Sequence, residues 1–141
     1  MKTKTFLFLC CFLGFGLTQL SAQTIPKGAI IGLHVIKMTL HPDATMNQAM
    51  DFLINKYIPA AEKNFPGTKM YLLSGDRGES KFNFALMEVF ESAQVRDKYY
   101  PAQDKSSPEG EAATKKLQES LGDISKLFLD YSTDYTDWII K

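Results

Sequence analysis

The first third of the chain shows an apolar strand pattern followed by a helical stripe. Residues 28–40 carry Ile, Val, Leu and Thr at both sets of alternating positions, which predicts a strand buried on both faces. This strand should end at Pro42, because proline cannot donate a hydrogen bond to a sheet. From Thr45 to Asn64, apolar residues recur every three or four positions, which predicts an amphipathic helix with a kink or break at Pro59.

A hairpin and a short helix are expected next. The segments 69–74 and 81–91 are mostly apolar, and residues 75–79 between them contain two glycines and an aspartate. Two apolar runs joined in this way are typical of a β-hairpin. Ser92 then caps a short helix over residues 93–100, which Pro101 ends.

The remaining residues predict one longer helix and a final strand. Ser107-Pro108 is a favourable helix start, with serine at the cap and proline in the first turn. One face of this helix should be buried, and its members are Ala113, Leu117, Leu121 and Ile124. Residues 131–140 predict the last strand.

The resulting order, β-α-β-β-α-α-β, predicts an α+β fold of the ferredoxin-like type. Two right-handed crossovers around a hairpin give a four-stranded antiparallel sheet in the spatial order 4-1-3-2, with the helices on one face. The central strands are nevertheless apolar on both faces: Ile31, Leu33 and Val35 alternate with Ile30 and Ile36, and Ala85, Met87 and Val89 alternate with Phe82, Phe84, Leu86 and Phe90. An apolar sheet face without helices marks an interface or a ligand site, so we expect a partner to cover it.

Three segments within residues 28–101 add a family resemblance. They are the apolar opening strand, the Phe65-Pro66-Gly67 turn, and the segment from Phe90-Glu91-Ser92 to Tyr99-Tyr100-Pro101. With these features the chain resembles the dimeric α/β-barrel superfamily, which includes antibiotic-biosynthesis-type monooxygenases and stress-responsive barrel proteins. The resemblance implies a homodimer in which two sheets pack face to face, and a pocket between sheet and helices in each monomer. Haem-degrading members rely on a histidine in the second helix region; residues 92–100 contain none, and we expect no cofactor.

Residues 1–22 are typical of a signal peptide. Lys2 and Lys4 precede a nearly unbroken apolar run from Phe6 to Leu17, and small residues follow at Ser21-Ala22. As a helix this run is about 18 Å long, which is too short to cross roughly 30 Å of hydrocarbon. A lipoprotein signal is disfavoured because Leu9, which is not small, precedes Cys10. We therefore expect export, to the periplasm or out of the cell, as a single domain of residues 23–141.

Removal of residues 1–22 changes the chemistry available to the chain. It takes away both cysteines of the sequence, so the mature domain would have no disulfide, no thiolate nucleophile and no cysteine ligand for a metal. It also lowers the basic count from 16 to 14 against 16 acidic residues. This near-neutral balance does not favour nucleic acid or an anionic membrane as a partner, and no membrane span is expected in the mature chain.

His34 and Glu88 are the candidate catalytic residues. Each is a polar member of an otherwise apolar alternating set, on strands that should be antiparallel neighbours. A carboxylate beside an imidazole raises its basicity, so the pair would make a general base if the strand register brings the two together. The alternative is a buried hydrogen bond, or two residues at the dimer interface, without a catalytic role.

Apolar and aromatic residues are the candidate ligand contacts. Phe84, Leu86, Tyr99 and Trp138 are the predicted ligand-binding residues, although aromatic residues in strands more often belong to a core or an interface. No metal site is expected, because no suitable spacing of His, Asp and Glu occurs, and the acidic residues Asp130, Asp134 and Asp137 fit a charged edge strand.

Three functions remain open at this point. The first is an exported homodimer that binds a small, largely apolar molecule between sheet and helices. The second is a cofactor-independent monooxygenase or isomerase with Glu88 or His34 as the base. The third is a purely structural dimerisation module.

Overall fold

The computed structural model describes residues 24–81, 83–103 and 105–141. The expected signal peptide, both cysteines and Phe82 lie outside these residues.

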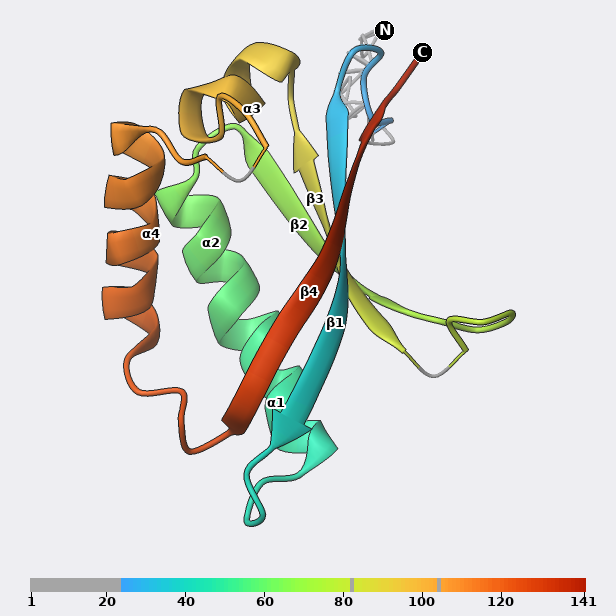
Figure 1. The fold of residues 1–141 in the computed structure, drawn as a ribbon, viewed down its shortest axis with the longest axis vertical. Coiled ribbons are helices and arrows are strands. Elements are labelled where there is room, and N and C mark those ends of the chain that lie inside the picture. Colours follow the sequence, from blue (N-terminus) through green and yellow to red (C-terminus); the bar gives the residue numbers. More distant parts are fainter. Residues whose placement is uncertain (1–23, 82, 104) are drawn as a thin grey trace, which may run out of the picture.

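The four strands form one antiparallel sheet (Figure 1). They are β1 (Ile30–Leu40), β2 (Thr68–Ser74), β3 (Phe84–Phe90) and β4 (Phe128–Ile139), in the spatial order β2-β3-β1-β4. This order confirms the α+β, ferredoxin-like prediction with the first and third strands in the centre. Three strand boundaries differ by two or more residues from the prediction, and the first is the start of β1, which lies at Ile30 and not at residue 28. β3 begins at Phe84 because Asn83 closes the hairpin loop, and β4 begins earlier than expected because Phe128 pairs with Leu40.

The first helical region is continuous but changes its hydrogen-bond pattern. It consists of α1 (Met46–Phe52), the π-helical turn η1 (Leu53–Tyr57) and α2 (Ile58–Asn64). Thr45 caps α1 in a capping box, in which its hydroxyl accepts from the Gln48 N–H at 3.3 Å and the Gln48 side chain accepts from the Thr45 N–H at 2.8 Å. The predicted kink at Pro59 takes the form of η1, where the Ile58 N–H donates to the Leu53 carbonyl. The wider turn makes room for a residue that has no N–H and whose ring crowds the preceding turn.

Two further helices follow the hairpin. They are α3 (Ala93–Tyr99), capped by Ser92, and α4 (Pro108–Leu121), capped by Ser107. The turn before β2 needs Gly67, which has a φ of 91° and whose added Cβ would lie 2.8 Å from Val95 of α3. Ile124 was wrongly predicted to lie on the last helix, because α4 ends at Leu121 and Gly122 turns the chain with a φ of 67°.

The helices pack on one face of the sheet, with both termini of the described chain at the same end (Figure 1). α2 packs on β2, and α4 packs chiefly against α2 and α3. One cluster of buried residues joins Ile30 and Phe90 to these helices, and a second joins Phe52 and Leu53 to Phe128. Beyond Phe128, every residue of β4 is exposed, so the helix layer leaves this edge strand open.

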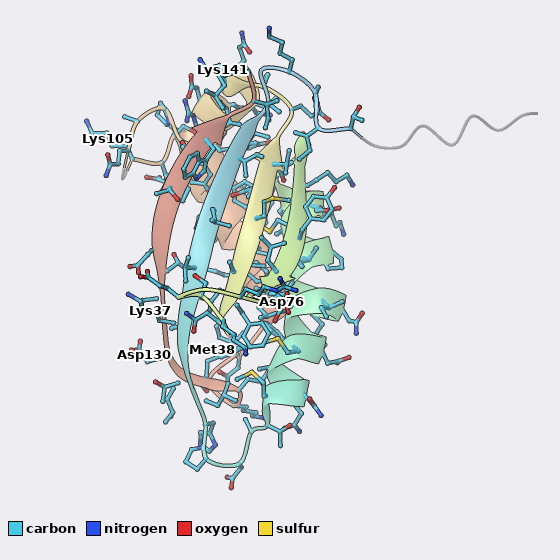
Figure 2. The ribbon with its side chains drawn as sticks, turned by 90° about the vertical axis from the view of Figure 1, so that its right-hand side faces the viewer. Lys37, Met38, Asp76, Lys105, Asp130 and Lys141 are labelled. Atoms are coloured by element: carbon cyan, nitrogen blue, oxygen red, sulfur yellow. The ribbon has the colours of Figure 1, made fainter. Side chains whose placement is uncertain are left out.

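The strand register assigns the alternating residues to two faces. Ile30, His34 and Ile36 of β1 pair with Phe90, Leu86 and Phe84 of β3 on the side that contacts the helices. The other set forms the helix-free face, and its apolar members are Ile31, Leu33, Val35, Tyr71, Leu73, Ala85, Met87, Val89 and Trp138. In Figure 2 this face is toward the viewer, and the β2–β3 connection, marked by Asp76, crosses in front of it.

Candidate functional site

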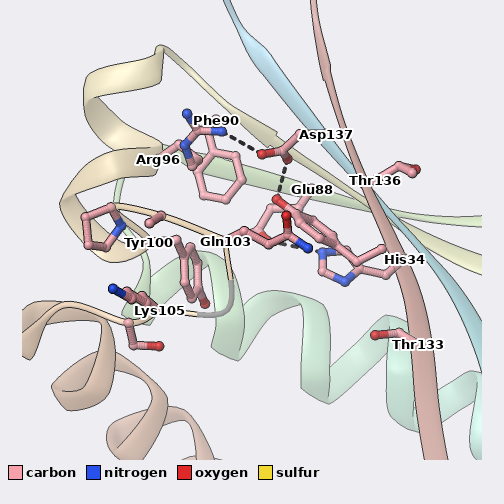
Figure 3. Close-up of a pocket in the computed structure, with 14 residues that line it drawn as sticks. His34, Glu88, Phe90, Arg96, Tyr100, Gln103, Lys105, Thr133, Thr136 and Asp137 are labelled. Carbon is pink, nitrogen blue, oxygen red and sulfur yellow. Dashed lines mark hydrogen bonds and ion pairs between the residues drawn. The ribbon is translucent and has the colours of Figure 1, made fainter.

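The main cavity lies between the sheet and the segment that joins α3 to α4 (Figure 3). Its volume is about 980 Å³. The sheet contributes residues from β1, β3 and β4, namely His34, Glu88, Phe90, Thr133, Tyr135 and Asp137. The opposite wall comes from α3 and the residues after it, including Arg96, Tyr100, Gln103 and Lys105. The cavity therefore combines titratable groups with aromatic rings.

Glu88 and His34 meet at the floor of this cavity. Glu88 is directly opposite Gly32 in the sheet, and His34 is two residues further along β1, so the two side chains are diagonal neighbours on the same face. His34 Nε2 lies 3.8 Å from Glu88 Oε2, which is an ion-pair distance and longer than a hydrogen bond. The predicted pairing is confirmed as a contact. Whether the pair is catalytic stays a prediction.

Burial changes the acid–base properties of both groups. Glu88 is only 5% exposed. Desolvation, with a smaller contribution from the negative charge of Asp137, raises the pKa of its carboxyl to about 7. Desolvation also lowers the pKa of His34, although Asp137 partly opposes this shift. Near neutral pH the pair therefore consists of a neutral imidazole and a carboxyl that is about half protonated.

A second carboxylate, Asp137, lies beside this pair and is held by two donors. Arg96 Nη1 from α3 donates to Asp137 Oδ2 at 2.5 Å, and the Tyr135 hydroxyl donates to Asp137 Oδ1. Arg96 Nε also donates to Asp97 at 2.6 Å, so this guanidinium is shared between two carboxylates. The Tyr135 ring lies against His34, with 4.6 Å between the ring centroids. Asp137 therefore links the edge strand to α3 across the cavity.

A smaller, apolar cavity of about 120 Å³ lies next along the sheet. Leu53 and Tyr57 of η1 form one wall, and Ile36 and Leu86 belong to the sheet side. Burial, together with the charge of Glu88, raises the pKa of the Tyr57 hydroxyl to about 12. Tyr57 thus lines the apolar cavity while it lies within the electrostatic reach of Glu88.

The four predicted ligand contacts lie in four different places. Leu86 lines the apolar cavity, and Phe84 faces the helices at the start of β3. Tyr99 is 2% exposed and belongs to the core, where its hydroxyl donates to the Pro66 carbonyl at 3.0 Å. Trp138 is 61% exposed and lies on the helix-free face. The fold thus places Leu86 near the Glu88–His34 pair, whereas Phe84, Tyr99 and Trp138 line neither cavity.

The sequence interpretation missed the role of the residues around Asp137. Asp137 was assigned to a charged edge strand, and no role was predicted for Arg96. Asp130 and Asp134 do lie on the helix-free side, but Asp137 is opposite Gly32 and lies on the helix side. The spacing of three residues between Asp134 and Asp137 was the available signal for this placement, because residues an odd number of positions apart lie on opposite faces of a strand.

Two other classes of site were sought within the described residues. No group of three His, Cys, Asp or Glu side chains there is arranged to hold a metal ion. None of the helices in that part of the chain has the length and hydropathy needed to cross a membrane.

Comparison with known proteins gives little beyond the fold. The chain matches no protein-family model and no curated protein. Among solved structures it is similar to a protein from Bacteroides fragilis described as a dimeric protein of unknown function and ferredoxin-like fold. The TM-score is 0.40 and the identity 15%, over 81% of this chain and 98% of the other. At that level of similarity, the description as a dimer applies to the Bacteroides protein and carries no argument about this chain, whose fold rests on its own sheet topology.

Proposed function

We propose that this chain is an exported homodimeric domain that binds a small organic molecule in the main cavity. The observation that carries the binding proposal is Glu88, a carboxyl that is 5% exposed at the floor of a cavity of about 980 Å³. A buried carboxyl is costly unless it has a partner, and its nearest cation-forming neighbour, His34, is held neutral by burial. A ligand with a hydrogen-bond donor would stabilise the ionised carboxyl.

The lining indicates the chemistry of this ligand. Phe90, Tyr100 and Tyr135 offer ring faces, which favour an aromatic or flat apolar body. Glu88 and Asp137 offer acceptors, and Gln103 and Lys105 on the opposite wall offer donors. The ligand we propose is therefore more polar than the largely apolar molecule expected from the sequence: it combines an apolar ring with at least one hydroxyl or amine.

The helix-free face supports the homodimer. Its centre is apolar, with Leu33 and Met87 opposite each other in the sheet. At its edge, Lys37 and Asp134 form an ion pair at 2.6 Å. An apolar centre with a polar rim is the usual composition of a protein interface. A second copy packed sheet to sheet would match the arrangement that the family resemblance implies.

Native mass spectrometry of the protein, purified from the exported fraction of its source, tests these points together. We expect a chain that begins at Gln23, a dimer mass, and extra mass that disappears in the Glu88→Gln variant but not in Glu91→Gln, since Glu91 lies outside the cavity. A dimer without extra mass in any preparation would favour the purely structural module. A monomer would contradict the homodimer, and a chain that keeps residues 1–22 would contradict export.

A charge on the helix-free face tests the dimer independently. Leu33→Asp would bury a carboxylate between two apolar sheets, so we expect its dimer dissociation constant to rise by more than about 100-fold. Ser132→Asp is the matched control, because it places the same charge opposite Lys37 at an exposed edge of the same face. Sedimentation velocity measures both constants. Equal dimerisation of the two variants would exclude this face as the interface.

A second candidate function, a cofactor-independent isomerase, is favoured by the pKa of Glu88. A carboxyl with a pKa of about 7 is well matched to remove a proton from carbon at neutral pH. On a β,γ-unsaturated carbonyl compound, the Glu88 carboxylate would accept the α proton while the C–H electron pair forms a dienolate with the carbonyl, and the protonated carboxyl would return the proton to the γ carbon, so that the C=C bond moves to the α,β position. NMR in D₂O tests this reaction on the captured ligand. Deuterium exchange that is absent in Glu88→Gln and normal in Glu91→Gln is expected of the enzyme, whereas a bound ligand that never exchanges contradicts it.

A further inference from the structure

The two cavities lie end to end along the same face of the sheet. On β3, Glu88 lines the main cavity and Leu86, the next residue on that face, lines the apolar one. On β1, the same step of two residues leads from His34 to Ile36. His34 is opposite Leu86, so the change from polar to apolar lies two residues, about 7 Å, further along on β1 than on β3, and the boundary runs diagonally across the sheet.

The edge strand shows that the two cavities are contiguous. On β4, Tyr135 lines the main cavity, Tyr131 lines the apolar cavity, and Thr133 between them lines both. Thr133 is itself exposed, because the helix layer leaves β4 open. Thr133 is therefore the β4 residue at the junction, and a molecule that extends from one cavity to the other would pass it.

The helix that covers the apolar cavity has a local irregularity at this point. η1 supplies Leu53 and Tyr57 to the wall, and a π-helical turn changes which side chains face the sheet. Such turns occur often at functional sites. The cavity volume of about 120 Å³ is close to the roughly 150 Å³ of an apolar cavity that holds benzene. The space therefore suits a short hydrocarbon group.

We infer that the ligand is an amphiphile. Its head is a ring that carries a hydroxyl or amine beside Glu88, and its short apolar tail passes Thr133 into the apolar cavity. This inference rests on the proposed function, and it adds the class of ligand. Arg96 and Asp137 are at the end of the main cavity that belongs to the head group, and Leu53 and Phe128 are at the end that belongs to the tail.

A series of 4-alkylphenols tests the inference by isothermal titration calorimetry. Phenol probes the main cavity alone, and ethyl, propyl and butyl groups probe the extension. Each methylene that becomes buried should tighten the dissociation constant about fourfold until the apolar cavity is full. Dissociation constants that are the same for phenol and for all three alkylphenols would overturn the inference, while binding of phenol would still support the proposed function. No binding of any member at millimolar concentration would contradict both.

Two variants locate the tail. Thr133→Phe places a ring at the junction of the cavities, so the gain in affinity from phenol to butylphenol, measured within this variant, should be lost. Ser132→Phe is the matched control, because this neighbour on the same exposed strand points to the other face of the sheet. It should retain the full gain. A chain-length gain that survives in Thr133→Phe would overturn the inference.

Discussion

The two faces of the sheet are built from the same strands and have opposite properties. On the helix side, β1 and β3 bring His34 and Glu88 into a cavity, beside apolar residues that pack against α2 and α4. On the helix-free side, the intervening residues Leu33 and Met87 form an apolar surface that none of the helices in the described part of the chain covers. A step of one residue along a strand thus separates a candidate binding site from a candidate interface.

This difference has a simple physical cause. Side chains alternate across a strand, so an apolar residue at every position makes both faces suitable for burial. A polar residue placed at one position then becomes buried on one defined face. His34 and Glu88 both fall on the side that the helices cover, where desolvation changes their pKa values in opposite directions.

The largest expected difference between the faces is in stability. Phe90, on the helix side, is 1% exposed, and Phe90→Ala should cost about 3–5 kcal/mol of unfolding free energy. Trp138, on the other face, is 61% exposed, and Trp138→Ala should cost about 0.5 kcal/mol or less in the monomer. Urea denaturation of both variants at several protein concentrations distinguishes a core residue from an interface residue. The loss in Phe90→Ala should be independent of concentration, and a loss in Trp138→Ala that grows with concentration would place Trp138 in the dimer interface.

The next largest effect is the contribution of Glu88, on the helix side, to the pH dependence of folding stability. Its folded pKa of about 7 is above the ordinary 4.5, so between these values the folded state binds more protons than the unfolded state. Stability therefore falls as the pH rises through this window, by about 3 kcal/mol in total. His34 acts in the opposite sense, because its lowered pKa removes stability as the pH falls below 6.5.

The Glu88→Gln variant isolates this contribution. Urea denaturation of the native protein and the variant at pH 4.5, 6 and 8 should show the variant gaining stability over the native protein as the pH rises. If the difference in unfolding free energy stays constant from pH 4.5 to 8, the carboxyl is not desolvated as described.

The smallest expected effect is that of the Asp137 charge on the pKa of Glu88. Asp137→Asn removes the charge that helps to raise the pKa of Glu88, and it frees Arg96 from one partner. The pKa of Glu88 should therefore fall below 7 but stay above 4.5, because burial is the larger cause. Carboxyl carbon chemical shifts measured over pH 4–9 give this value, and Asp134→Asn, on the opposite face, should leave it unchanged.

Local sequence pattern was sufficient for most of the fold. Alternation and helical spacing led to the four strands and the helical regions in the right order, and the handedness of the crossovers led to the order of the strands in the sheet. The errors lie at boundaries, such as the start of β3 and the position of Ile124. There, a loop hydrogen bond or a single glycine with positive φ ends an element, which periodicity does not reveal.

The candidate site was predictable only in part. His34 and Glu88 could be found because each interrupts an apolar set on neighbouring strands. The odd spacing of Asp137 from Asp134 could have placed it on the helix side, but its pairing with Arg96 could not be predicted, because the two residues are 41 positions apart. Tyr99 and Trp138 are residue types that often contact ligands, yet packing places Tyr99 in the core and Trp138 on the helix-free face.

The chain alone thus specifies which segments become strands and helices, because periodicity and proline or glycine act over a few residues. It also specifies that both faces of the central strands can be buried. Only the tertiary structure decides that Glu88, His34 and Asp137 share one cavity and that an apolar cavity continues it past Thr133. These are relations between strands, set by register and by the position of the helix layer, and both depend on long-range packing.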